Sequence, residues 1–100
     1  MAQFSGGCNC GAVRFLSMGR PDRVGLFHCL EGRKNHGALF YAAAICPDAA
    51  VTVGREPKED ARRFFCATCG SSVFARSGDE NERHLGAVDV PNQLTQSYES

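Results

Sequence analysis

Apolar residues occur along the chain in short runs separated by turn-forming residues, a pattern typical of β-strands. An unbroken apolar run covers residues 38–45 between Gly37 and Pro47, and its Phe, Tyr and Ile side chains favour a buried strand over a helix. The turn residues 77–81 lead into residues 83–90, which we expect to pair with the preceding strand as a hairpin. Further strands are predicted at residues 13–16, 24–29, 51–53, 62–65 and 72–76.

Helix is expected to be a minor component. No segment keeps the helical apolar period over several turns, and the charged residues 55–60, with Pro57 among them, are expected to form an exposed loop. About seven strands with turns roughly every 8–12 residues indicate an all-β fold. The length of 100 residues predicts one domain over residues 1–100.

Charge and hydropathy argue against several function classes. The chain has 11 Lys and Arg against 11 Asp and Glu, so no net charge attracts nucleic acid, and it has no aromatic platform for bases. No stretch approaches the roughly 20 apolar residues that cross a bilayer, and the first residues lack the pattern of a secretory signal. We therefore expect a cytoplasmic protein that binds neither nucleic acid nor membrane.

Cysteine is unusually frequent, with six in 100 residues. Such a count fits either a disulfide framework or a metal site, and a reducing compartment favours the metal site. The strongest pattern is a pair of cysteine motifs, each followed by glycine: Cys8-Asn9-Cys10-Gly11 and Cys66-Ala67-Thr68-Cys69-Gly70. Four thiolates satisfy tetrahedral Zn²⁺, and the glycines permit the sharp turns that let two nearby cysteines bind one ion.

The alternatives for these four cysteines are ordinary buried thiols or two disulfides. A disulfide within Cys8-Asn9-Cys10 would close a strained ring, which disfavours that pairing. A zinc ion held by four thiolates has no open position for substrate, so this site is expected to be structural. Of the remaining cysteines, Cys46 is predicted to be a buried apolar residue.

A second, weaker cluster of polar residues covers residues 27–37. It offers His28, Cys29, Glu31 and His36 as metal donors, but adjacent side chains on an extended chain point to opposite faces. The alternative is a free thiol beside a surface histidine and a basic loop. Arg33 and Lys34 of that loop suit either a solvated face or a clamp for carboxylates.

These residues, in this order, resemble the GFA/CENP-V family, named for the glutathione-dependent formaldehyde-activating enzyme. The resemblance covers residues 6–15, 28–29, 33–34, 37, 63–72 and 86–89. It implies a Mss4-like all-β fold with several small antiparallel sheets around a structural zinc site. That site would consist of Cys8, Cys10, Cys66 and Cys69, in agreement with the spacing argument. Family members usually continue into a Trp-containing stretch, so this domain is expected to be short at its C-terminus.

The resemblance also implies carbon–sulfur lyase activity on an adduct of glutathione and formaldehyde. The family holds a second, catalytic zinc with Cys-x-Cys-x-x-Cys or His-Cys-x-x-Cys. In this chain Cys29 matches the middle cysteine, whereas Phe27 and Gly32 stand at the outer positions. Cys29 and His28 are therefore expected to be a remnant of the second metal site. The corresponding expectation for substrate binding is that Arg33 and Lys34 pair with carboxylates of a glutathione-like molecule.

Three functions are compatible with these residues. The first is a family-type lyase that acts on a small thiol such as glutathione or its aldehyde adduct. The second is a non-catalytic, zinc-stabilised binding module that keeps the fold without the second metal. The third, a redox protein using Cys29, has the least support because no resolving cysteine is close in sequence. We expect one firmly bound zinc and weak or absent lyase activity.

Overall fold

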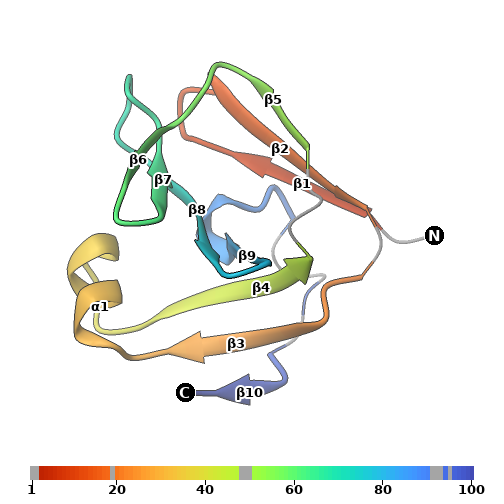
Figure 1. Cartoon of the computed structure of the whole chain (residues 1–100), viewed down its shortest axis with the longest axis vertical. Coiled ribbons are helices and arrows are strands. Elements are labelled where there is room, and N and C mark those ends of the chain that lie inside the picture. The colour runs from red at the N-terminus through yellow and green to blue at the C-terminus, as the bar shows by residue number, and fades with distance from the viewer. Residues whose placement is uncertain (1–2, 19, 48–50, 91–93, 95) are drawn as a thin grey trace.

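The computed structural model describes residues 3–18, 20–47, 51–90, 94 and 96–100. Within them the chain is mainly β-strand, in two sheets (Figure 1). The strands are β1 (Gln3–Gly7), β2 (Val13–Met18), β3 (Arg23–Phe27), β4 (Tyr41–Pro47), β5 (Val51–Gly54), β6 (Lys58–Asp60), β7 (Arg63–Phe65), β8 (Ser72–Ser77), β9 (Glu80–His84) and β10 (Tyr98–Glu99). The helical elements are α1 (Leu30–His36) and a 3₁₀ turn, η1 (Leu85–Ala87). The predicted all-β fold with little helix is confirmed.

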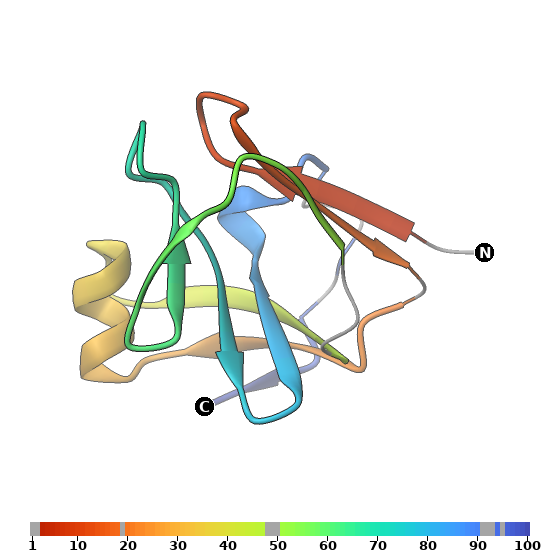
Figure 2. The same cartoon turned by 45° about the horizontal axis from the view of Figure 1, so that its top comes forward.

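The two sheets differ in size and are built mostly from hairpins. The smaller sheet has the order β1-β2-β5, and the larger has the order β10-β3-β4-β9-β8-β7-β6. Neighbouring strands are antiparallel except β10, which pairs parallel with β3. The smaller sheet lies over one side of the larger one, and α1 lies where β3 passes into β4 (Figures 1 and 2).

The core lies between the two sheets. Phe4 and Phe15 of the smaller sheet belong to the same buried cluster as Val24, Ala44 and Phe74 of the larger sheet. Alternation along β1 and β2 places these aromatic residues on the inner face, where removal from water stabilises the fold. Cys46 belongs to this cluster and is 6% exposed, so its predicted burial is confirmed.

The segment that follows β9 ties the larger sheet to the smaller one. Val88 forms an isolated antiparallel bridge with Gly6, and the Ser5 hydroxyl donates to Asp89 Oδ2 at 2.8 Å. A Cβ on Gly6 would come within 2.2 Å of the Ala87 carbonyl oxygen. Glycine is therefore needed there to let the two backbones approach.

The short helix α1 was not predicted, because it makes only two turns and contains a glycine. The helix lacks a continuous apolar face, and capping hydrogen bonds stabilise it instead. At its N-terminus, Cys29 Sγ accepts the Gly32 N–H at 3.3 Å. Gly37 ends the helix in the left-handed conformation, with φ 64°. The strand predicted at residues 38–45 was therefore placed too early, because the chain is still leaving the helix at residue 38. β4 begins only at Tyr41, and the preceding Leu39 and Phe40 are 78% and 52% exposed.

Three other sequence predictions need correction. Residues 58–60 form the edge strand β6 instead of a loop, although all three side chains are exposed as expected. The hairpin partner of β8 is β9, which ends at His84 because η1 follows directly. Strand β1 was missed because its two glycines disguised the alternation. Among the described residues, no helix has the length and apolar character to cross a membrane.

Candidate metal centre

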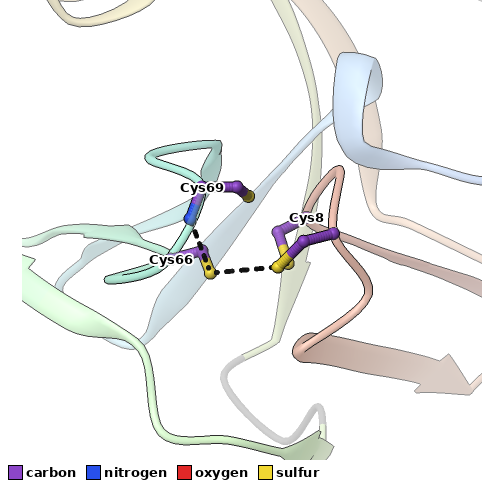
Figure 3. A group of neighbouring side chains, drawn as sticks. Cys8, Cys66 and Cys69 are labelled. Atoms are coloured by element: carbon purple, nitrogen blue, oxygen red, sulfur yellow. Dashed lines mark hydrogen bonds between the residues drawn. The ribbon is translucent and has the colours of Figure 1, made fainter.

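The two cysteine motifs, which are far apart in sequence, meet at one place between the sheets. Cys8 and Cys10 lie in the turn between β1 and β2, while Cys66 and Cys69 lie in the turn between β7 and β8. The four Sγ atoms all lie within 4.8 Å of one another. Figure 3 shows Cys8 facing Cys66 and Cys69 from the opposite turn. We call these residues the four-cysteine centre.

Local backbone geometry explains how each motif presents two sulfurs to one point. Gly11 and Gly70 both have positive φ, at 83° and 78°, directly after the second cysteine of each motif. Their N–H groups close tight turns onto the carbonyls of Cys8 and Cys66, at 3.2 and 2.9 Å. The glycines predicted to permit sharp turns therefore do so.

Backbone N–H groups surround the two buried sulfurs. Val13 donates to Cys8 Sγ at 3.3 Å, and Thr68 donates to Cys66 Sγ at 3.3 Å. Cys66 is 0% exposed and Cys8 is 7% exposed, whereas Cys10 and Cys69 are exposed at the rim of the centre. N–H donors of this kind stabilise thiolate sulfur that is bound to a metal.

The four thiols influence one another's ionisation. The Ser71 side chain and then its backbone lower the pKa of Cys69 to about 5, so this residue readily becomes a thiolate. Hydrogen bonding from the Ala12 backbone lowers the pKa of Cys10, but neighbouring thiols, Cys8 first, outweigh it and raise the pKa to about 11. Four sulfurs this close cannot all ionise without a cation between them. The residues therefore fit a tetrahedral metal ion with thiolate ligands.

Ser71 links the two turns of the centre and is a residue that the sequence analysis missed. Its hydroxyl accepts the Asn9 N–H at 3.0 Å and lies 3.1 Å from Cys69 Sγ. Because such outer contacts orient metal ligands, Ser71→Ala is expected to weaken metal affinity by roughly 10–100-fold. A competition titration with a chromophoric chelator measures this change. Ser97→Ala, away from the centre, serves as the control, and equal affinities for both variants would contradict the role of Ser71.

The second predicted cluster does not converge. His28 Nε2 lies 2.6 Å from Glu99 Oε2 on β10, whereas Cys29 Sγ lies on the other side, 3.9 Å from the Tyr41 hydroxyl. Adjacent residues thus point apart, as the extended chain predicted. Among the described residues, the only group of three or more His, Cys, Asp or Glu side chains placed to share an ion is the four-cysteine centre.

Aromatic rings fill the place where the family resemblance implies further ligands for a second metal. Phe27 stacks on Tyr41 with ring centroids 5.3 Å apart. A Cβ on Gly32 would lie 2.1 Å from a carbon of the Tyr41 ring, so a cysteine there would collide with it. Tyr41 is fixed from the other side by His36, stacked at 4.2 Å. Within the described part of the chain, the residues around Cys29 therefore do not fit a second metal ion.

The two basic residues of α1 that were predicted to bind substrate differ in exposure. Arg33 is half-buried, and its Nε has no hydrogen-bond partner in the described part of the chain, whereas Lys34 is exposed. Glu31, one of the candidate donors, is 3.6 Å from Arg63 in an exposed ion pair. Such a pair contributes little to stability.

Comparison with known proteins agrees with this geometry. The sequence profile of the family described as glutathione-dependent formaldehyde-activating enzyme (GFA) matches residues 3–99. None of the curated proteins compared with the chain matches it. The match spans almost the whole chain and includes both cysteine motifs of the metal centre. The chain therefore belongs to the GFA family.

Proposed function

We propose that this chain is a one-zinc member of the GFA family. In this proposal the four-cysteine centre holds a structural zinc ion, and the domain binds a small thiol such as glutathione or its aldehyde adduct. Carbon–sulfur lyase turnover is weak or absent. The family's dependence on glutathione supports a thiol partner. The observation that carries the one-zinc assignment is the Tyr41 ring, which occupies the space that a side chain at Gly32 would need.

Chemistry favours zinc as the ion. Four thiolates in a closed tetrahedral set are typical of structural zinc, and they leave no coordination position for substrate. Zinc bound here would join the β1–β2 turn to the β7–β8 turn and so fasten the two sheets together. The ligand site for the thiol is proposed at α1, where Cys29 presents an exposed sulfur and Arg33 and Lys34 supply positive charge for carboxylates.

Metal content tests the one-zinc proposal directly. Elemental analysis is expected to give one zinc per chain in the unmodified protein and in Cys29→Ser, and none in Cys69→Ser. Gly32→Cys is also expected to bind one zinc, because the new side chain meets the Tyr41 ring. The resulting overpacking is expected to lower its free energy of unfolding by about 1–3 kcal/mol. Two zinc ions in the unmodified protein, or loss of zinc in Cys29→Ser, would refute the proposal.

The competing function is lyase activity of the family type. Its support is the environment of Cys29, whose sulfur accepts the Gly32 N–H at 3.3 Å and lies 3.9 Å from the Tyr41 hydroxyl, a group able to donate to a thiolate. Donors of this kind stabilise developing charge on sulfur. An assay of adduct cleavage separates the two functions: turnover at an ordinary enzymatic rate, lost in Cys29→Ser, would favour the enzyme.

A further inference from the structure

A cavity of about 300 Å³ opens beside α1 and is not part of the metal centre. Its polar lining comes from His36, Ser72 and His84. The rest of the lining is apolar or aromatic and includes Ala38, Phe40 and Ala42. None of the described lining residues is Asp, Glu, Lys or Arg. A concave site with apolar walls and a few polar groups is the usual form of a small-molecule site.

The two histidines in the cavity are held in their neutral forms. Burial, and after it the positive charge of Arg63, lower the pKa of His36. Burial, and after it the repulsion that a protonated His36 would exert, lower the pKa of His84 to about 3. The charge of Arg63 lowers the pKa of both histidines, but neither Arg63 nor Glu82 is among the described residues that line the cavity. The described lining therefore places no charged side chain in contact with an ionic ligand.

The two histidines that line this cavity do not use all their ring nitrogens in side-chain hydrogen bonds with the described residues. His84 is 3% exposed, and its Nδ1 is 3.2 Å from Ser72 Oγ, which Asn35 Nδ2 also reaches at 3.0 Å. These contacts occupy Nδ1 of His84, and no side chain of the described residues hydrogen-bonds to its Nε2. Neither ring nitrogen of His36 has such a hydrogen bond either. Each neutral imidazole offers one donor and one acceptor, so a bound polar group can either accept a hydrogen bond from a ring or donate one to it.

We infer that this cavity binds a small uncharged organic molecule with an apolar body and one carbonyl or hydroxyl group. The apolar body would pack against Ala38, Phe40 and Ala42, while the polar group would hydrogen-bond to His36 and His84. Charged analogues are disfavoured because burying an unpaired charge among such walls is costly. The inference goes beyond the proposed function and does not rest on it, because the ligand is neither a metal nor a thiol. The cavity shares no residue with the four-cysteine centre, although Tyr41, which lies 3.9 Å from Cys29 Sγ, is part of its lining.

Three ligands of matched size test the inference: benzyl alcohol, benzoate and benzylammonium. Each is titrated into the metal-loaded protein while the ring ¹⁵N and ¹H signals of His36 and His84 are followed by NMR. Benzyl alcohol is expected to shift both sets of signals saturably and to bind at least about 10-fold more tightly than either ion. Equal affinity for all three, or no saturable shift, would overturn the inference.

Two variants in the cavity lining and one control outside it locate the binding. Ala42→Leu fills the space and is expected to abolish saturable binding, whereas Ser77→Leu, an exposed position at the far end of β8, should leave it intact. His36→Phe retains the stacking on Tyr41 but removes the polar ring, so benzyl alcohol affinity should fall by roughly 2–10-fold. Unchanged binding in both Ala42→Leu and His36→Phe would also overturn the inference.

Discussion

Removing the metal from the four-cysteine centre is expected to unfold the protein. The centre joins turns that are 55 residues apart in sequence and belong to different sheets. Structural zinc contributes roughly 10–16 kcal/mol of apparent binding free energy in small zinc domains. The whole stability of a domain is about 5–15 kcal/mol. The free energy lost with the ion should therefore exceed the free energy of unfolding that a core of this size supplies alone.

The measurement is a thermal melt followed by circular dichroism, with and without a strong chelator at neutral pH. The chain also provides a matched pair of variants, because Cys66 and Cys46 are both buried, at 0% and 6% exposed. Cys66→Ser should lose the metal and unfold. Cys46→Ser should retain the metal and lose only about 1–3 kcal/mol for burying a hydroxyl. An unchanged melting temperature in demonstrably metal-free protein would contradict a structural role for the ion.

The metal centre could be predicted from sequence because its signals are local. Each cysteine pair is held within four residues, and Gly11 and Gly70 mark the turns directly. Chain folding needs only to bring two preformed turns together, and the free-energy cost of that closure grows slowly with the number of residues between them. Most strands were predictable for a similar reason, since alternation within a few residues identifies them.

The surroundings of Tyr41 could not be predicted, because they depend on contacts between distant segments. The Tyr41 ring meets Phe27 from β3, His36 from α1 and His84 from β9. No periodicity links these residues in the sequence. Only the fold shows that the cluster fills the place of a second metal site and lines the cavity beside α1. The presence of glycine at position 32 did not by itself indicate which aromatic ring would lie against that position.

Arg83 is the second residue whose role became evident only from the fold. Arginine is almost never fully buried, so nothing in the sequence indicated that Arg83 lies in the core. In the structure it is 0% exposed, and its guanidinium lies over the rings of Phe15 and Phe74, 4.6 and 4.9 Å from their centroids. Its Nε donates to Ser17 Oγ at 3.2 Å. Arg83 thus connects the larger sheet to the smaller one, as the metal centre does.

Arg83→Ala is accordingly expected to be among the most destabilising substitutions outside the metal centre. It removes two cation–π contacts, each worth up to about 2 kcal/mol when desolvated, and leaves a cavity between two aromatic rings. We expect the free energy of unfolding to fall by about 3–5 kcal/mol, measured by urea denaturation of the metal-loaded protein. The loosened contact between the sheets should also weaken metal binding, because the two cysteine turns lie on different sheets.

Arg83→Met separates packing from charge. Methionine refills most of the space between Phe15 and Phe74 without the cost of keeping a cation away from water, so its loss of stability should be much smaller than that of Arg83→Ala. If both variants lose the same free energy, the cation itself holds the sheets together. If neither loses more than about 1 kcal/mol, the inter-sheet role of Arg83 is wrong. The expected order, with the alanine variant least stable, would show that packing of the Arg83 side chain, more than its charge, joins the two sheets.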